Sequence, residues 1–332
     1  MPTNEDKVLD ALLSANNVII FTHARPDGDA LGSSFGLRDF LRSCNIKADV
    51  MLTETPPSRY IPLCDNPIRK LDKESLAEYD LVVTCDCANH ERLACDSKIT
   101  IDDLRQKKFV NIDHHHNNNI AGNIELLKVD SSSNCKIVAE LLLSTGKELP
   151  QSTLNWLLLG MMTDTGSFRF SNTCGDTLRT AAILLDKGAQ LEKIVNQIYL
   201  SKPYNQLLFE TELVDTRLHL FCNKRFAIAS LPQELMDKYN FKIKEDEGLI
   251  DILRGIDTVI ISALVTRVHG GYKVSLRSKD SNYPVRPIAQ IWNGGGHDLA
   301  SGTTMPAEEF NSFDEVEAKL AEVVDSILPP IE

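Results

Sequence analysis

The sequence predicts an α/β fold in which an N-terminal open parallel sheet, flanked by helices, is joined by a helical linker to a smaller mixed-sheet α/β domain. Three observations support this. Apolar runs such as Val18–Phe21, typical of strands buried on both faces, alternate with helical segments up to about residue 188. A helical pattern interrupted at Pro203 follows. Beyond it, Gly270-Gly271 joins two strand-like runs, which indicates a hairpin.

Within the N-terminal half, strand-like and helix-like segments alternate as a parallel sheet requires. The predicted strands are Val18–Phe21, Ala48–Leu52, Asp80–Cys85 and the run that begins at Phe109. The predicted helices are the segment after the capping box Thr3/Asp6, then Ala30–Leu41, Ile101–Gln106, Cys135–Ser144, a helix from Thr153 to Met162 capped by Ser152, and a helix capped by Asp176 and ended by Gly188.

The C-terminal half has its own mixture of predicted strands and helices. The expected strands are Arg225–Leu231, Thr258–Thr266 and Tyr272–Leu276, and the expected helices are Pro232–Tyr239, Glu247–Gly255, Val285–Trp292 and Phe313–Leu328. We therefore divide the chain into a first domain at residues 1–190, a helical linker at 191–218 and a second domain at 219–332.

Size and composition are those of a soluble two-domain protein. The chain has 332 residues, of which 42% are hydrophobic and 25% charged. No apolar run approaches the roughly 20 residues of a membrane helix, and the polar start is unlike a signal peptide. The eight cysteines, Cys95 among them, are scattered without repeated pairs, so we expect reduced thiols. These features predict a cytoplasmic protein with no membrane partner.

The net charge of −12 bears on the kind of ligand. Proteins that hold long duplex nucleic acid by counterion release usually present a broad basic face. This chain lacks the excess of Lys and Arg that such a face needs. We therefore expect no long duplex partner, and any nucleic-acid ligand should be short and held by a local site.

Acidic and imidazole side chains follow the predicted strands of the first domain. In an open parallel sheet, ligands bind outside the carboxyl ends of the strands, because these ends meet at one edge. Three polar clusters each follow a predicted strand, and one further acid ends a predicted helix. The candidates are His23, Asp27, Asp29, Asp86, Asp113, His114, His115 and Asp164. We expect the three clusters to meet at one edge, with Asp164 as a fourth contributor.

Carboxylates gathered at one edge would repel each other strongly without a cation. Ligation by carboxylate and imidazole suits manganese, iron, zinc or magnesium. Two divalent ions would neutralise Asp27, Asp29, Asp86 and Asp164, with one carboxylate bridging ions roughly 3.5–4 Å apart. Such a pair activates a water, so no side-chain nucleophile is required. The alternative is that the clusters are unrelated solvated loops and that the histidine triplet is fortuitous.

These residues resemble the motifs of the DHH phosphoesterase superfamily. The matching segments are 23–33 (HARPDGDALGS) for the first motif, Asp86 for the second, Asp113-His114-His115 for the motif that names the family, and 164–173 (DTGSFRFSNT) for the fourth. The C-terminal half resembles the family's associated domain through 274–278 and 294–297. The resemblance spans nearly the whole chain. Among subfamilies, the chain looks most like the bifunctional oligoribonucleases with pAp phosphatase activity (nanoRNases).

Carried over position by position, the resemblance implies two divalent metal ions, with Mn²⁺ as the family's usual metal and Mg²⁺ or Co²⁺ as options. One ion would be held by His23, Asp27 and Asp86, and the other by Asp29, Asp86, His114 and Asp164. As catalytic residues, His115 would contact the scissile phosphate and Asp113 would support a neighbouring imidazole. His116 is expected to lie outside the ligand set.

In the second domain, the resemblance implies a site that holds the non-scissile part of the substrate across an interdomain cleft. The implied contacts are Arg277, Ser278, Gly295, Gly296 and His297. An arginine offers a bidentate fork to a phosphate, and glycines let the backbone approach it closely. The glycines alone would fit a simple turn equally well. Relatives often carry a basic residue near position 298, where this chain has an aspartate.

The resemblance implies a hydrolase that cleaves short oligoribonucleotides (nanoRNA) to mononucleotides and removes the 3′-phosphate of pAp. Alternatives are a phosphodiesterase for linear dinucleotides (pApA or pGpG) in cyclic-dinucleotide turnover, a RecJ-like single-strand exonuclease, and an inorganic pyrophosphatase. Outside the enzymes, the alternative is a nucleotide-binding protein, which the complete ligand set argues against. The expected partners are short RNA, pAp or linear dinucleotides, and a homodimer is left open.

Overall fold

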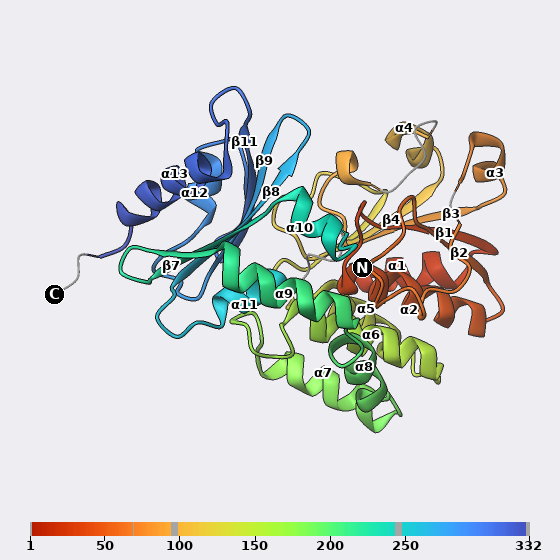
Figure 1. The fold of residues 1–332 in the computed structure, drawn as a ribbon. Coiled ribbons are helices and arrows are strands. Elements are labelled where there is room, and N and C mark those ends of the chain that lie inside the picture. The colour runs from red at the N-terminus through yellow and green to blue at the C-terminus, as the bar shows by residue number, and fades with distance from the viewer. Residues whose placement is uncertain (1, 69, 94–98, 243–247, 330–332) are drawn as a thin grey trace. The chain divides into compact units, whose positions relative to one another are not determined.

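The computed structural model describes residues 2–68, 70–93, 99–242 and 248–329. The chain forms two compact units that divide between Ser201 and Lys202 (Figure 1). This boundary lies between α8 (Leu191–Tyr199) and α9 (Tyr204–Arg217). Of the sequence-based expectations, Cys95 and Glu247 fall outside the described residues. Within the described ranges, no helix is long and apolar enough to cross a membrane.

The first unit contains a five-stranded sheet whose strands are all parallel. The strands lie in the order β2-β1-β3-β4-β5. Their bounds are β1 Asn17–Phe21, β2 Lys47–Met51, β3 Leu81–Cys85, β4 Lys108–Asp113 and β5 Ile124–Leu127. The predicted open parallel sheet is confirmed. The edge strand β5 was not predicted, since it is only four residues long.

Helices cover both faces of this sheet because successive strand residues point to opposite sides. Ile20 and Val83 belong to the core on one face, and Ile19 and Val82 to the core on the other. The first core is closed by α1 (Asn4–Leu13), α2 (Gly28–Ser43), α5 (Asn134–Ser144) and α6 (Gln151–Asp164), and the second by α3 (Lys73–Ala77) and α4 (Ile101–Arg105) (Figure 1). The sheet is thus flanked by helices, as predicted.

Two predicted helix caps are wrong. Helix α6 begins at Gln151 with Pro150 as its N-cap, so Ser152 lies inside the first turn. Helix α7 (Gly175–Asp186) has Cys174 as its N-cap, and Asp176 is also within the first turn. An acid there still favours the helix, because it faces the positive end of the helix dipole.

The second unit contains a six-stranded mixed sheet in the order β10-β11-β9-β8-β7-β6. Only the β7–β8 pair is parallel. The strands are β6 Leu218–Phe221, β7 Phe226–Leu231, β8 Ile261–Val268, β9 Gly271–Ser278, β10 Gly295–His297 and β11 Ala300–Pro306. The helices are α9, α10 (Gln233–Lys238) and α11 (Leu249–Arg254) against one core, and α12 (Arg286–Gln290) and α13 (Phe313–Asp325) against the other. The mixed sheet is as predicted, although β6, β10 and β11 were not.

Candidate metal centre

The first group of candidate ligands lies where β1 leads into α2. Asp27 is the N-cap of α2, and its Oδ1 accepts hydrogen bonds from the amides of Asp29 (3.1 Å) and Ala30 (3.0 Å). Its other oxygen, Oδ2, lies 3.8 Å from His23 Nε2. The capping bond therefore fixes the carboxylate with one oxygen turned to the histidine.

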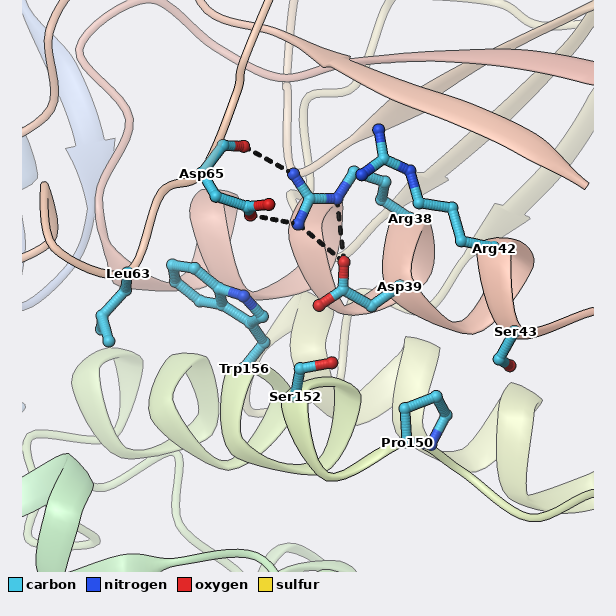
Figure 2. Close-up of a pocket in the computed structure, with 9 residues that line it drawn as sticks. All are labelled: Arg38, Asp39, Arg42, Ser43, Leu63, Asp65, Pro150, Ser152 and Trp156. Carbon is cyan, nitrogen blue, oxygen red and sulfur yellow. Dashed lines mark hydrogen bonds and ion pairs between the residues drawn. The ribbon is translucent and has the colours of Figure 1, made fainter.

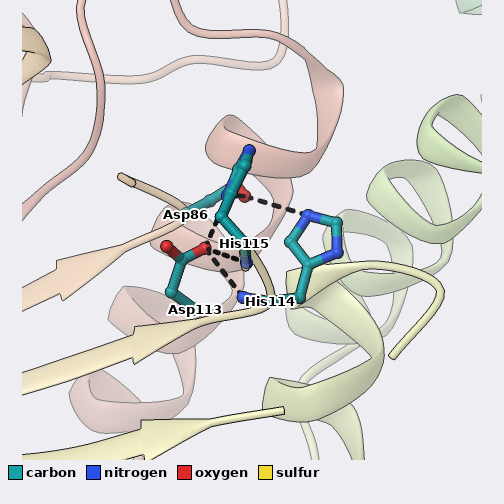
Figure 3. Close-up of side chains that lie close together, drawn as sticks. All are labelled: Asp86, Asp113, His114 and His115. Carbon is teal, nitrogen blue, oxygen red and sulfur yellow. Dashed lines mark hydrogen bonds and ion pairs between the residues drawn. The ribbon is translucent and has the colours of Figure 1, made fainter. Parts of the chain in front are cut away.

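Asp86 follows β3 directly and faces two histidines. Its backbone is in the left-handed region, with φ of +55°, a conformation that Asp tolerates better than most residues. Its Oδ2 lies 3.9 Å from His23 Nε2. Its Oδ1 lies 3.4 Å from His114 Nε2 (Figure 3). Asp86 is only 2% exposed, and its Oδ1 has no hydrogen-bond partner among the described residues. A buried carboxylate oxygen in this state calls for a cation.

Both histidines present the same ring nitrogen to the carboxylates. His23 Nδ1 lies 2.8 Å from the carbonyl oxygen of Ala24, and His114 Nδ1 lies 3.2 Å from that of Ser131. A carbonyl can only accept, so Nδ1 carries the proton in each ring and Nε2 is left as the ligand atom. A backbone acceptor behind the ring is the usual support of a metal-binding histidine.

Helices α2 and α6 pack very closely through glycines spaced four residues apart. Gly28, Gly32 and Gly36 lie along one face of α2. A Cβ on Gly32 would lie 2.6 Å from the carbonyl oxygen of Trp156, and one on Gly28 would lie 2.4 Å from Thr163 Oγ1. The start of α2 therefore lies beside the end of α6, and the two helices run antiparallel.

This packing brings Asp164, the last residue of α6, to the strand ends. Asp164 Oδ2 lies 3.9 Å and Asp29 Oδ2 lies 3.8 Å from His114 Nε2. Asp29 is further held by the first amides of α5, since its two oxygens accept from the amides of Asn134 (2.6 Å) and Cys135 (2.8 Å). Asp29 and Asp164 therefore face the same imidazole from two helices.

The DHH triplet itself divides into three kinds of environment. Asp113 is fully buried, and its Oδ1 lies 2.8 Å from His115 Nδ1, while its Oδ2 accepts from Asn118 Nδ2 at 2.5 Å. His114 and His115 lie side by side (Figure 3). His114 Nε2 faces Asp29 and Asp164. His116 is exposed. Asp113 therefore supports His115 by a hydrogen bond, whereas His116 points to solvent.

The electrostatics of the cluster reflect crowded negative charge. Burial and the neighbouring Asp86 raise the pKa of Asp29 to about 7, and burial together with Asp29 raises the pKa of Asp164 well above its usual range. Burial lowers the pKa of His23, but Asp27 and Asp86 outweigh it, so that this pKa rises to about 9. In the absence of metal, protons bound to these side chains thus reduce the repulsion between the carboxylates, which a divalent cation would otherwise do.

The side chains fit a divalent metal ion by number and by chemistry. The potential ligand atoms form three groups in which all atoms lie within 4.8 Å of one another: His23/Asp27/Asp86, Asp29/His114/Asp164 and Asp86/Asp113/His114/His115. Carboxylate oxygens with imidazole nitrogens suit Mn²⁺, Fe²⁺, Zn²⁺ or Mg²⁺. In the third group, Asp113 is already occupied by hydrogen bonds. The first two groups are therefore the better metal sites.

Sequence reasoning missed a residue that connects two of these groups. Asn134 is fully buried at the start of α5. In the amide orientation that satisfies its neighbours, its oxygen accepts from the Asp86 amide at 3.0 Å and from Ser33 Oγ at 3.1 Å, and its NH₂ donates to the Ile112 carbonyl at 3.2 Å. Asn134 therefore holds the backbone of Asp86, but no sequence pattern that we used would have predicted it.

The candidate phosphate contacts of the second unit lie on three adjacent strands. Arg277 on β9 pairs with Ala300 on β11, which pairs in turn with His297 on β10. Paired residues point to the same face, so the half-buried Arg277 and the exposed His297 flank Ala300 at a backbone separation of about 10 Å. Asp298, in the turn between β10 and β11, pairs with Arg286 at 2.9 Å. The acid at 298 is thus engaged with a neighbouring arginine.

The glycines at 294–296 and Ser278, which lie beside Arg277 and His297, differ in the packing and hydrogen bonds that surround them. A Cβ on Gly294 would lie 2.3 Å from a backbone oxygen, and Gly296 has φ of +133°, so both positions need glycine structurally. Gly295 is different, because a Cβ there would meet nothing within 4 Å among the described residues. Ser278 is 3% exposed and donates to the Asp280 carbonyl at 2.9 Å. Gly295 is therefore the glycine that packing does not explain.

A separate hollow of 510 Å³ lies between α2 and α6 (Figure 2). Arg38, 2% exposed, lines it beside Trp156. The Arg38 guanidinium donates to Asp39 Oδ1 (2.9 and 2.7 Å) and to the Asp65 carbonyl (2.8 Å) and carboxylate (2.5 Å). These bonds neutralise the arginine, so the hollow offers no strong anion site.

Comparison with known proteins agrees with the fold and the motifs. Residues 17–161 match the DHH family, N-terminal domain, and residues 223–324 match the DHHA1 domain. The chain belongs to the DHH superfamily of phosphoesterases and is thus a hydrolase of phosphate esters.

Relatives of known name cover almost the whole chain. The bifunctional oligoribonuclease and PAP phosphatase NrnA of Bacillus subtilis is 29% identical over 322 residues, which cover 93% of this chain and 94% of that protein. The protein of the same name from Thermus thermophilus is 27% identical over 291 residues, covering 87% and 84%. An exopolyphosphatase-related protein from Bacteroides fragilis has a solved structure with a TM-score of 0.85 at 24% identity, covering 97% of this chain and 95% of that one. This structure shares the fold.

Proposed function

We propose that this protein hydrolyses the phosphodiester bonds of short oligoribonucleotides to mononucleotides and also removes the 3′-phosphate of pAp. The position of Asp86 carries the proposal, since its two oxygens face His23 and His114 in the two groups of potential metal ligands. The relatives named as oligoribonuclease and PAP phosphatase support the choice of substrate, because they match both units.

The ligands would divide between two divalent ions, with Mn²⁺ expected and Mg²⁺ or Co²⁺ as options. The first site would consist of His23, Asp27 and Asp86, and the second of Asp29, Asp86, His114 and Asp164. When bound, such ions supply a water of lowered pKa and neutralise charge on the phosphate. The protein itself holds the carboxylates in place through the capping bond of Asp27 and the α5 amides on Asp29.

His115 would bind the scissile phosphate. Its Nδ1 is held by Asp113, which places Nε2 on the opposite edge of the ring, where it would meet the phosphate. A nearby carboxylate also favours the protonated ring, and although burial lowers the pKa of His115, Asp113 and Asp86 raise it overall. A cationic imidazole is a suitable partner for a phosphate oxygen.

The second unit would hold the part of the substrate that is not cleaved. Arg277, Ser278, Gly295, Gly296 and His297 are the proposed contacts. Arg277 and His297 point from the same face of the sheet, and Gly295 leaves room for a ligand close to its backbone. A small binding site of this kind suits a short anionic ligand, because a chain with a net charge of −12 lacks the excess of Lys and Arg that a broad basic surface for a long ligand would need.

Two other substrates would use the same chemistry. A linear dinucleotide, pApA or pGpG, is short enough for such a small binding site. A RecJ-like single-strand exonuclease is less well supported, since the matched relatives of B. subtilis and T. thermophilus are named oligoribonuclease and PAP phosphatase. The test compares hydrolysis rates on pAp, pApA, pGpG and RNA from two nucleotides upward, with Mn²⁺. The proposal expects the highest rates on the shortest RNA together with release of phosphate from pAp. No product from any of these with Mn²⁺, Mg²⁺ or Co²⁺ would overturn it.

A further inference from the structure

Two polar residues lie inside the parallel sheet, in a row that is otherwise apolar. Thr84 on β3 and Asn111 on β4 are paired in register and are fully buried. Two positions earlier in the same row, Val82 and Phe109 belong to the hydrophobic core. Burying a side-chain amide is unfavourable unless it is hydrogen bonded. The partners of Asn111 must therefore account for it.

These partners form a continuous chain of hydrogen bonds that ends on the DHH triplet. Thr84 Oγ1 donates to Asn111 Oδ1 at 2.9 Å, and Asn111 Nδ2 donates to Asn118 Oδ1 at 2.9 Å. Asn118 Nδ2 then donates to Asp113 Oδ2 at 2.5 Å, and Asp113 Oδ1 lies 2.8 Å from His115 Nδ1. Four hydrogen bonds thus connect the interior of the sheet to the imidazole.

The backbone fixes the direction of this chain. The Ile120 amide donates to Asn118 Oδ1 at 3.0 Å, and an amide N–H can only donate. The Asn118 NH₂ group therefore faces the other way, where it donates to the Cys87 carbonyl at 3.0 Å as well as to Asp113. Both donors and both acceptor positions of Asn118 are used. Asn118 cannot turn over without losing its bonds to two backbone groups.

Asp113 receives hydrogen bonds on both oxygens. Its Oδ1 also accepts from the amides of His114 (2.7 Å) and His115 (3.3 Å). A carboxylate surrounded by N–H donors acts only as an acceptor, so the proton of the shared bond belongs to His115 Nδ1. This orientation places His115 Nε2 on the ring edge opposite Asp113.

We propose that Asn118 is a positioning residue for His115: by holding the Asp113 carboxylate, it fixes the imidazole with Nδ1–H towards Asp113 and Nε2 towards the scissile phosphate. This inference rests on the proposed function for the role of His115. It extends the active site to a residue outside the four family motifs. Thr84 and Asn111 anchor Asn118 from inside the sheet.

A purely structural role for Asn118 would be to tie down the segment after the triplet. The same segment offers a control for this, because Asn123 Oδ1 accepts from the Phe109 amide at 2.9 Å. This bond holds the segment to β4 and is separate from the chain of hydrogen bonds that reaches Asp113 and His115. Asn118→Asp and Asn123→Asp are the same chemical change, from amide to carboxylate, at nearly equal volume. Only the first removes the donor to Asp113 and places two carboxylates together.

The kinetic test uses the full chain with Mn²⁺ and a dinucleotide RNA. Asn118→Asp should lower kcat by about 10- to 100-fold, the effect of losing a partner that orients a site residue, while KM changes by less than about threefold. Asn123→Asp should retain the kcat of the unaltered protein. A fall in kcat that is equal in the two variants would overturn the inference.

The second test does not depend on activity. Nitrogen-15 NMR of histidine-labelled full chain, loaded with diamagnetic Mg²⁺, reports which ring nitrogen is protonated, and His115→Gln identifies the His115 signals. We expect both ring nitrogens of His115 to be protonated, with Nδ1–H in its hydrogen bond to Asp113, in the unaltered protein and in Asn123→Asp. In Asn118→Asp, where this hydrogen bond is disturbed, the Nδ1 signal should shift. Unchanged His115 signals in Asn118→Asp would overturn the inference even if the chain proved to cleave a different substrate. If Asn118→Asp fails to fold by circular dichroism, Asn118→Ser is measured against the same criteria.

Discussion

Asp86 Oδ1 lies 3.4 Å from His114 Nε2, and this buried oxygen has no hydrogen-bond partner among the described residues. We expect Asp86→Asn to abolish most metal binding and to lower kcat/KM by about a thousandfold, since a bound metal is worth several kcal/mol of transition-state stabilisation. Asparagine also tolerates the left-handed backbone at this position. Metal content by mass spectrometry and circular dichroism should show a folded, metal-poor protein. Asp102→Asn, on exposed α4 surface, is the control and should bind metal normally.

Metal binding should strengthen as pH rises. The raised pKa values of Asp29 (about 7) and His23 (about 9) mean that both groups hold protons near neutral pH when no metal is bound. A metal ion must displace these protons, so its affinity should rise by about tenfold per pH unit for each proton released. Isothermal titration with Mn²⁺ between pH 6 and pH 8.5 measures this. A Mn²⁺ affinity that is the same at pH 6 and at pH 8.5 would contradict this prediction.

The same shifts predict how the stability of the metal-free protein depends on pH. A pKa raised in the folded state adds stability below the unfolded pKa and loses it as pH rises through the folded pKa. For Asp29 this loss falls between about pH 4 and 7, and for His23 between about pH 6.5 and 9. The melting temperature of the protein stripped of metal by a chelator should therefore fall from pH 6 to pH 8.5. The rise in melting temperature on adding Mn²⁺ should become larger over the same range. If the rise in melting temperature on adding Mn²⁺ became smaller between pH 6 and pH 8.5, the result would be inconsistent with these pKa shifts.

Gly32→Ala should destabilise the first unit. The added Cβ would lie 2.6 Å from a backbone oxygen of α6 and 2.7 Å from Cys135 Sγ, so the helices must move apart. Overpacking of this kind costs about 1–3 kcal/mol, or about 2–4 °C of melting temperature per kcal/mol for a unit of this size. Gly175→Ala is the matched control, because its Cβ would approach only the flexible side chain of Arg179. Scanning calorimetry should show a lower transition for Gly32→Ala alone.

Arg277→Ala should impair substrate binding with little effect on the metal centre. Loss of a charge-assisted hydrogen bond to a phosphate corresponds to about 1.5–3 kcal/mol, so KM should rise by about 10- to 100-fold while kcat changes by less than about threefold. Lys319→Ala removes a positive charge from α13 of the same unit, where it pairs with Glu322, and should leave KM unchanged. Equal KM values for both variants would remove Arg277 from the proposed site.

The sequence predicted those parts of the fold and site that follow from strand topology. Strands that are parallel have their carboxyl ends at one edge, so Asp86 and His114 could be placed together from their positions after apolar runs alone. The short strands β5, β6 and β10 were not predicted, because three or four residues carry too little periodicity. The glycine run at 294–296 suggested a loop, yet two of its residues form part of β10.

The remaining features depend on contacts between residues far apart in the chain. Asn118 follows the triplet within a polar stretch, and nothing in that stretch distinguishes a solvated asparagine from one that is hydrogen bonded to a buried carboxylate. Asn134 makes its contacts to Asp86 across 48 positions of sequence. Asp164 was predicted as a contributor, but the reason that it reaches the site, the close approach of α2 and α6, needed the structure.

That close approach also limits how this sequence can change during evolution. At Gly28 and Gly32 the side chain is already a single hydrogen atom, so no smaller residue is available and any larger one pushes α6 away from α2. Because α2 carries Asp29 and α6 carries Asp164, a substitution at either glycine would change the distance between these two candidate ligands without replacing either of them. A stabilised variant selected for heat tolerance should therefore accumulate its substitutions elsewhere, and a library that randomises these two positions should return glycine.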